Sequence, residues 1–265
     1  SANSFATNSV VLGFSGVLTL GGNVTYDATN NPGRSTISGE SISSSGYPFN
    51  GSLNLGSATR TFNVGNSNNA MNDLTIFSRI DGFSGESLVK TGSGSLVLAG
   101  QSTYGGGTTV QTGSGPLLLA SSSSKVASTI FAGPVGVGPL TLQSGTTLAP
   151  TGLFIPYGSF ENDIGLDNPV SLGDIVTLGS EQFPSHQRLS FRGAVNAGAA
   201  SATVHLGGLA PIEFAGSLNG ATAGTAITFD SGGSVAPGLA VITGSVGGNV
   251  ATLMADHAAI VFGTP

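Results

Sequence analysis

Three acidic residues in one short segment have the spacing in this sequence that most resembles a chemical site. Glu161, Asp163 and Asp167 lie within Phe160–Asp167, shortly after the turn-forming stretch Pro156–Gly158. Two carboxyl groups within about 5–10 Å of each other can cleave a glycosidic bond, and carboxylate oxygens are also the hard ligands that Ca²⁺ prefers. We interpret the group as a solvated acidic loop that protrudes from the fold, with a weak Ca²⁺ site as the alternative.

The basic residues and histidines do not complete a catalytic pattern. A polysaccharide lyase needs a basic residue beside its bound cation, and Arg188 and Arg192 are the nearest basic residues in sequence. His186, His205 and His257 are far apart and lack metal-ligand spacing, so we assign them structural or surface positions. The sequence contains no nucleophile elbow, Walker loop or Ca²⁺-binding nonapeptide. It therefore predicts a protein that is not an enzyme, with no catalytic, cofactor or metal residue and no cofactor.

The composition excludes several classes of partner. Only 8% of the 265 residues are charged, against about 25% in typical soluble domains. Seven Lys and Arg stand against 13 Asp and Glu, too few cations to bind nucleic acid or anionic lipid. No apolar run approaches the ~18 residues that span a bilayer, so we expect no membrane insertion by this segment. The absence of Cys is compatible with export but also with the cytosol.

Short extended segments dominate the secondary-structure pattern. Apolar and β-branched runs of three to five residues recur along the chain, bounded by Gly, Ser, Asn or Pro. Helical patterns are confined to Ser121–Phe131 and Val250–Ala259, and for the first we favour a polar loop that leaves the fold. Asn66–Asp73 is a second predicted loop. Phe residues spread singly along the chain predict stacking in a core rather than a sugar-binding platform.

One phrase recurs, and its repetition indicates a solenoid. A Gly opens the phrase and two apolar residues bracket a central one, at Gly16–Gly21, Gly51–Gly56, Gly94–Ala99, Gly115–Ala120 and Gly138–Gln143. The last three begin 21 and 23 residues apart. At about 20 residues per coil and ~4.8 Å per layer, the chain would make roughly 13 coils and a rod of about 60 Å. Stacked coils place like residues over like, which disfavours charge and accounts for its scarcity.

The predicted fold is therefore all-β, a β-solenoid formed by residues 1–265. The runner-up is a β-sandwich, because Asn50-Gly51, Asp81-Gly82 and Asn219-Gly220 are typical hairpin turns.

Residues Leu88–Leu148 resemble the passenger-associated transport repeat of bacterial autotransporters, most clearly over Leu88–Leu119. The residues that carry the resemblance are Leu88, Lys90, Gly92, Gly94, Leu96, Leu98, Gly100, Ser102, Tyr104, Gly106, Gly107, Thr108, Thr109, Val110, Gly115, Leu117 and Leu119. Two departures stand out. Ser102 replaces the family's Asn, and Pro116 removes a backbone donor at the start of a strand.

The resemblance implies a right-handed parallel β-helix that is secreted and exposed on a bacterial cell surface. The sequence shows no series of alternating ~10-residue strands for a membrane barrel. We expect either a passenger fragment or a free-standing secreted protein. Its start at Ser1 without a leader fits signal cleavage as well as an excised segment.

We expect a non-enzymatic structural protein: a self-assembling scaffold, fibre subunit or adhesin. Its partners would be copies of itself, docked end to end or by strand exchange through residues 1–12 and 258–265, and surface glycans. The alternatives are a pectate-lyase-like polysaccharide enzyme, detectable with uronic-acid polymers, and a phage-type fibre module, which would be a stable trimer.

Overall fold

The computed structural model describes residues 8–13, 15–29, 31, 33–39, 51–67, 70–151, 163–180, 187–233 and 237–263. These residues form strands and turns, and they include no helix that could cross a membrane. Strands pair in parallel throughout the described chain, except in one antiparallel hairpin and one isolated bridge.

The longest sheet has ten strands and contains strands from both ends of the described chain. In spatial order they are β1 (Asn8–Leu12), β4 (Ser35–Gly39), β7 (Leu74–Ile76), β10 (Leu96–Leu98), β12 (Leu117–Leu119), β16 (Thr146–Pro150), β19 (Ile175–Leu178), β22 (Ser201–Leu206), β25 (Thr225–Asp230) and β27 (Val250–Asp256).

Three further parallel sheets complete the coils. The eight-stranded sheet contains β3 (Val24–Tyr26), β6 (Arg60–Val64), β9 (Leu88–Thr91), β11 (Thr108–Val110), β15 (Leu140–Leu142), β18 (Val170–Leu172), β21 (Val195–Ala197) and β24 (Leu218–Gly220). The three-stranded sheet contains β2 (Val17–Thr19), β5 (Ser52–Asn54) and β8 (Arg79–Asp81). The five-stranded sheet contains β17 (Asp163–Leu166), β20 (Arg188–Phe191), β23 (Ile212–Phe214), β26 (Gly238–Ile242) and β28 (Ala258–Phe262).

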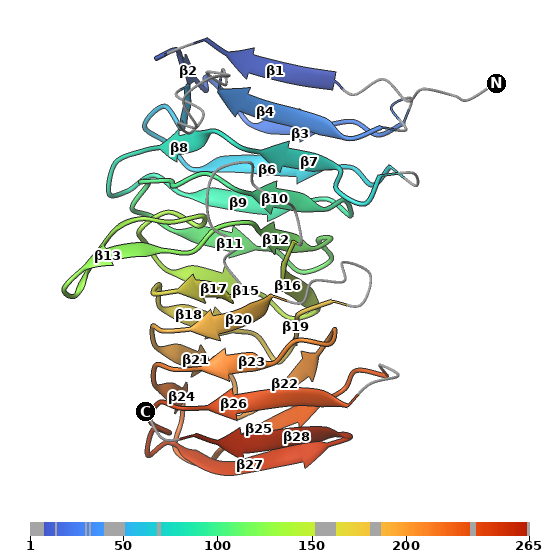
Figure 1. The fold of residues 1–265 in the computed structure, drawn as a ribbon, viewed down its shortest axis with the longest axis vertical. Coiled ribbons are helices and arrows are strands. Elements are labelled where there is room, and N and C mark those ends of the chain that lie inside the picture. The colour runs from blue at the N-terminus through green and yellow to red at the C-terminus, as the bar shows by residue number, and fades with distance from the viewer. Residues whose placement is uncertain are drawn as a thin grey trace.

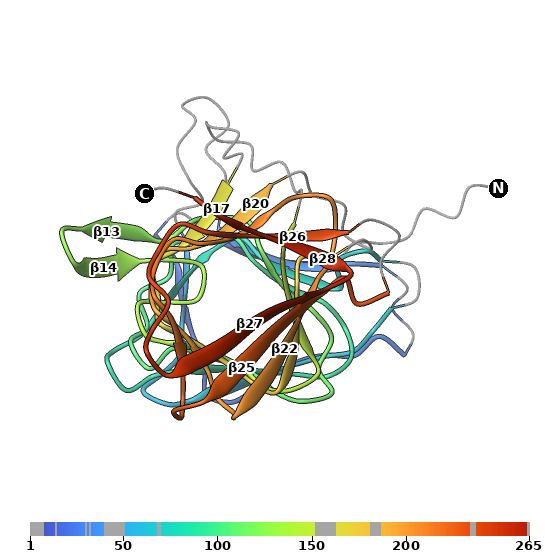
Figure 2. The same cartoon turned by 90° about the horizontal axis from the view of Figure 1, so that it is seen from below.

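Chain order assigns these sheets to three facets of one helix. A typical coil visits the ten-stranded sheet, then the three- or five-stranded sheet, then the eight-stranded sheet, as β1–β2–β3 and β16–β17–β18 do. The three- and five-stranded sheets therefore share one facet. The coils stack from the N-terminal to the C-terminal end (Figure 1) and enclose a common interior (Figure 2). The protein is a parallel β-helix, as predicted, and its parallel pairing excludes the runner-up β-sandwich.

The described chain makes ten coils, fewer than the roughly 13 predicted at about 20 residues per coil. Leu96 pairs with Leu117, 21 residues later, as the repeat spacing predicts. In contrast, 39 residues separate Ser35 from its partner Leu74. Insertions between facets lengthen such coils without adding a layer. At ~4.8 Å per strand, ten strands span about 43 Å rather than about 60 Å.

The repeated phrase marks inward-facing strands on every facet rather than one position per coil. Its first two copies form β2 and β5, which pair with each other, and the next two form β10 and β12. The fifth copy forms β15 on a different facet. The 23-residue step is therefore not a full coil. Each facet needs the same alternation of buried and outward residues, so the same phrase serves all three.

The interior consists of columns of like side chains. Leu74, Leu96, Leu117 and Leu148 stack in register on successive coils, and each is at most 3% exposed. Like residues on neighbouring coils therefore shelter each other from water, and burial of one such side chain contributes about 1.5–3 kcal/mol.

Phenylalanines pack together in the interior of the C-terminal half, as predicted, but Phe83, Phe131 and Phe262 are more than half exposed and contradict the prediction. The ring centroids of Phe191 and Phe214 are 5.5 Å apart, and Phe229 lies 5.5 Å from Phe214. All three rings are at most 1% exposed.

Both helical candidates are wrong. Part of 121–131 forms β13 (Ser124–Val126) and β14 (Thr129–Ala132), an antiparallel hairpin that projects from the body (Figures 1 and 2). The chain does leave the solenoid here, as we favoured, but as strands rather than as a loop. The second segment forms β27 and the start of β28. A parallel neighbour, β25, supplies the backbone partners of β27, and this pairing overrides a weak helical pattern. The described part of Asn66–Asp73 contains no strand, in agreement with the predicted loop.

Candidate functional site

The acidic segment does not form a protruding loop at Asp163, which is the first residue of β17. Ile164 and Leu166 are buried while Asp163 points outward, so the segment has the period-two alternation of a strand. Asp167 follows directly, and its side chain is only 3% exposed in an ion pair with Lys125 of β13. Asp163 and Asp167 therefore bind different partners and do not converge on one ion. Glu161 lies outside the described residues.

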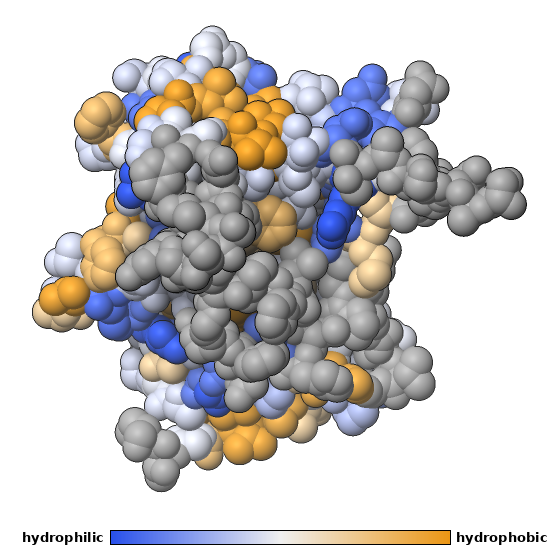
Figure 3. Space-filling model, turned by 45° about the horizontal axis from the view of Figure 1, so that its top comes forward, coloured by the Kyte–Doolittle hydropathy of each residue, from blue (hydrophilic) through white to orange (hydrophobic). Residues whose placement is uncertain are grey.

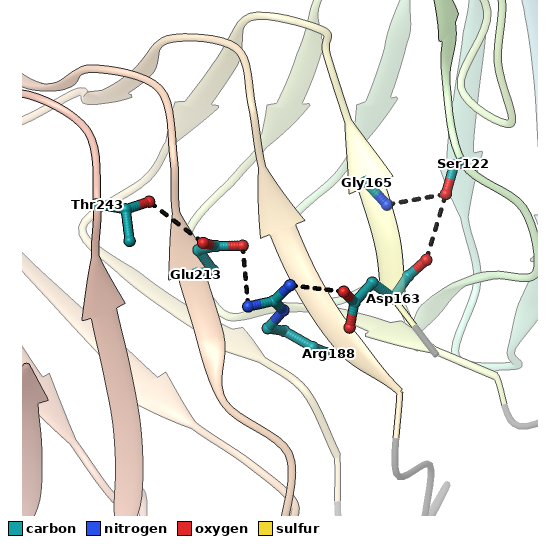
Figure 4. A network of polar contacts seen from close by, with 6 residues as sticks. All are labelled: Ser122, Asp163, Gly165, Arg188, Glu213 and Thr243. Carbon is teal, nitrogen blue, oxygen red and sulfur yellow. Dashed lines mark hydrogen bonds and ion pairs between the residues drawn. The ribbon is translucent and has the colours of Figure 1, made fainter. Parts of the chain in front are cut away.

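The five-stranded sheet brings Asp163 next to Arg188, one of the two basic residues that are nearest in sequence. The two residues are register partners on β17 and β20. Arg188 donates to Asp163 Oδ2 at 2.5 Å and lies 3.4 Å from Glu213 Oε2 on the next coil. Thr243 donates to the other oxygen of Glu213 at 3.2 Å. These outward side chains form a ladder across four coils of one facet (Figure 4).

The ladder continues around the open edge of β17. Gly165 N donates to Ser122 Oγ at 3.0 Å (Figure 4), and Ser123 N donates to Gly165 O at 2.8 Å. Arg192 covers the same strand, because a Cβ built on Gly165 would lie 2.2 Å from its guanidinium carbon. The side chain of Arg192 therefore lies on bare backbone that only glycine leaves open.

The ladder is held together by the positive charge of Arg188 between two carboxylates. The hydrogen bond from Arg188 to Asp163 raises the pKa of the guanidinium above its usual value, which keeps it charged. This one cation is hydrogen-bonded to Asp163 and ion-paired with Glu213. An exposed pair of this kind contributes about 0–1 kcal/mol to stability. The described residues contain no group of three or more His, Cys, Asp or Glu that could hold a metal ion.

The histidines lie apart from this ladder. His205 Nδ1 is 3.2 Å from Asp230 Oδ2, its register partner on the outer face of the ten-stranded sheet. His257 pairs with its neighbour Asp256 at the last corner, with an Nδ1–Oδ1 distance of 2.8 Å. His186 lies outside the described residues. The two described histidines therefore occupy surface positions beside carboxylates.

A second polar cluster, which sequence reasoning missed, fills a corner of the interior. Lys90 is fully buried, and its Nζ donates to Gly94 O at 2.7 Å and to Gly92 O at 3.2 Å. Asp73, 3% exposed, accepts from Ser95 N at 2.8 Å and attracts the ammonium group. Burial lowers the pKa of Lys90 from 10.5 to about 8. The signal was available, since Lys90 stands two residues from Leu88 on the inward period.

Both ends of the helix expose apolar side chains. At the N-terminal end, Val11 on β1 and Val17 on β2 are 59% and 62% exposed. At the C-terminal end, Met254, Val261 and Phe262 are 46%, 48% and 67% exposed. Orange surface is visible at the upper and lower ends of the molecule (Figure 3). The described parts of the predicted assembly segments 1–12 and 258–265 lie on these end coils.

Comparison with protein families finds one match. Residues 88–121 match the model of the family described as passenger-associated-transport-repeat, which confirms the resemblance seen in the sequence. The matched residues form β9 to β12 and one coil of the helix. No curated protein and no solved structure matches the chain. The matched repeat indicates a passenger-type domain of the kind that bacteria secrete or display on the cell surface.

Within that repeat, Ser102 lies between β10 and β11, where most other coils have a strand of the three- or five-stranded sheet. It is 1% exposed, and its Oγ accepts from Ile80 N at 3.1 Å. Its backbone forms an isolated bridge with Gly133. Ser102 therefore makes a buried hydrogen bond that links two coils.

Proposed function

We propose that this protein is a non-enzymatic scaffold of the bacterial cell surface whose copies associate through their open ends. The observation that carries the proposal is the placement of the passenger-type repeat. Residues 88–121 contain β9 to β12 and supply two neighbouring strands, β10 and β12, to the ten-stranded sheet that also contains β1 and β27. A repeat that supplies successive strands of a continuous stack supports a structural role.

The described charged groups support a structural role as well. Arg188 is shared by two carboxylates, and Asp167 and Lys125 neutralise each other. A catalytic carboxylate needs a neighbour that raises its pKa or a substrate-facing partner, whereas these groups are already paired with cations.

The chemistry of the two end coils supports self-association. β1 and β27 are the outermost strands of the ten-stranded sheet, so each presents backbone donors and acceptors on one edge. Exposed valines on the first coil and Val261 and Phe262 on the last would be buried by docking. Both ends belong to the same facets, with β28 and β2 beside β27 and β1. A second copy can therefore continue in parallel the ten-stranded sheet and the facet that contains β2 and β28.

Light scattering and electron microscopy over a concentration series test this proposal. We expect rods or oligomers that grow with concentration, and V11K and F262K should each prevent their growth because docking would bury an unpaired charge. V126K is the matched control, because Val126 is 69% exposed on the hairpin, away from both ends. Monomers at every concentration, or an equal effect of V126K, would refute docking between copies and assign the end coils to another segment of a longer chain.

The absence of enzymatic activity is tested separately. We expect no release of unsaturated or reducing sugars from uronic-acid polymers, with or without Ca²⁺. Activity that is lost in D163N and R188Q would overturn the non-enzymatic part of the proposal.

A further inference from the structure

The outer face of the eight-stranded sheet carries a column of uncharged side chains in register. The column runs through Thr61, Val89, Thr109, Thr141, Ser171, Asn196 and Asn219. Each is partly exposed, and on the last five strands it stands between two buried neighbours. All but Val89 carry a hydroxyl or carboxamide. The strands β9, β11, β18, β21 and β24 that carry most of the column lie above one another in Figure 1.

A second column lies two residues further along the same strands. It begins with Thr25, Asn63 and Thr91, which are register partners. Gln111 and Gln143 follow β11 and β15, and both are exposed. Side chains two apart on a strand share a face, so the two columns form one polar strip along the helix axis. The second column ends at Gln143, because Gly173, Gly198 and Ala221 occupy the equivalent positions on the later coils.

This strip differs from the other facets in charge. No outward position of β6, β9, β11, β15, β18, β21 or β24 is charged. By contrast, the five-stranded sheet displays Asp163, Arg188 and Glu213, and the ten-stranded sheet displays Asp230 and Asp256.

Several of the polar groups on the strip are not used by the fold. Within the described residues, the hydroxyls of Thr109, Thr141 and Ser171 form no hydrogen bond. Asn219 donates to Asn196 Oδ1 at 3.1 Å, so the column also orders itself where amides adjoin. Three consecutive coils therefore offer unpaired hydroxyls, roughly 4.8 Å apart, that can each donate and accept.

We propose that this strip binds an extended, neutral polysaccharide that lies along the helix axis. Sugar hydroxyls donate and accept like the Thr, Ser, Asn and Gln groups of the strip, and an uncharged polymer needs no counter-ion from it. A polyuronate or a nucleic acid would find no cation there. One sugar on one coil binds weakly, but a polymer that reaches several coils converts later contacts into intramolecular ones. The strip requires only one copy of the protein, so this inference adds a ligand to the proposed scaffold without depending on end-to-end docking.

Affinity electrophoresis through gels that contain a polysaccharide tests the inference on the whole chain. The probes are hydroxyethylcellulose, galactomannan and dextran as neutral polymers, with polygalacturonate as the acidic one. We expect retardation by at least one neutral polymer and none by polygalacturonate. A disaccharide of the retarding polymer should compete poorly. Retardation by polygalacturonate alone, or by no polymer, would overturn the proposal.

A matched pair of double variants locates the binding surface. T109V/T141V removes two adjacent hydroxyls from the strip while it keeps their shape, and T203V/T228V does the same to register partners on the outer face of the ten-stranded sheet. Loss of two hydrogen bonds should weaken binding about tenfold in the first variant only. Equal weakening by both variants would refute the assignment. Light scattering of the same samples reports assembly, so failure of glycan binding and failure of end docking are read separately.

Discussion

Replacement of Lys90 by methionine tests how a buried ammonium group is accommodated at the interior corner. Its Nζ reaches Gly94 O at 2.7 Å and Gly92 O at 3.2 Å, and no part of the side chain is exposed. Methionine has a similar length and no charge. The variant K90M therefore removes the titrating group while it retains most of the packing volume.

The magnitude follows from the pKa of Lys90, which burial lowers from 10.5 to about 8 despite the attraction of Asp73. Such a difference corresponds to about 3 kcal/mol between the two protonation states. Between these two pKa values the unfolded chain holds the proton and the folded chain does not. The free energy of unfolding therefore rises with pH in this window, and Lys90 should add about 2 kcal/mol between pH 7 and pH 9.5. Above that range, burial of Tyr104 raises its pKa and opposes the trend.

Guanidinium unfolding followed by circular dichroism at pH 7 and pH 9.5 measures this difference. We expect the rise in the wild type and its absence in K90M. The matched control is K125M, which removes the only other lysine. Lys125 is 44% exposed on the hairpin, and the variant should keep the wild-type difference. The same pH dependence in K90M and wild type would show that Lys90 is not held as a buried ammonium.

Four further substitutions probe the coil geometry by the same unfolding assay. Gly107 has φ +83, and an added Cβ would lie 2.1 Å from Pro139 O, so G107A should cost at least about 2 kcal/mol. Gly113 has φ +77 with open space around it, so G113A should cost about 1 kcal/mol, and the reverse order would contradict the clash. F214A should cost about 3–5 kcal/mol by opening the aromatic stack; a loss below 1 kcal/mol would refute tight packing there. The amide of Asn168 donates to two backbone carbonyls at 3.1 and 2.7 Å, so N168A should cost about 3 kcal/mol, and a neutral result would show that water replaces it.

The alternation of strands was predictable because each strand has one buried and one outward face. The inward leucines of β10 and β12 stack at the 21-residue step that the sequence shows. The number of coils was not predictable, because it depends on which strands are register partners. Leu117 and Leu140 are the first apolar residues of similar phrases, yet they lie on different facets. Nothing in the local pattern distinguishes a strand that begins a new layer from one that completes the current layer.

Outward positions were also harder to predict than inward ones. Val97, Leu118 and Ala149 point away from the interior but are fully buried in a second apolar cluster. A period of two predicts that these side chains point away from the interior. It does not show whether other residues cover them. The candidate site could likewise be predicted only in part. Arg188 and Arg192 were both candidates from their proximity in sequence, and nothing in the sequence distinguished them, whereas Glu213 joins the ladder only because β23 follows β20 in the sheet.

The few charged residues of this protein, 8% of the chain, are not spread evenly over its outer surface. In the described strands they are concentrated on some facets of the helix and absent from the outward positions of another. In a parallel stack, a charged side chain faces the residue at the same position one coil away. Arg188 is tolerated because Asp163 and Glu213 lie on the adjacent coils. The exception is at the C-terminal end, where Asp230 lies between His205 on one coil and the like-charged Asp256 on the next. A facet without such pairs remains stable only if its columns are neutral, as Thr141 and Ser171 are. The outer face of the eight-stranded sheet has such neutral columns, and it is therefore suited to an uncharged ligand.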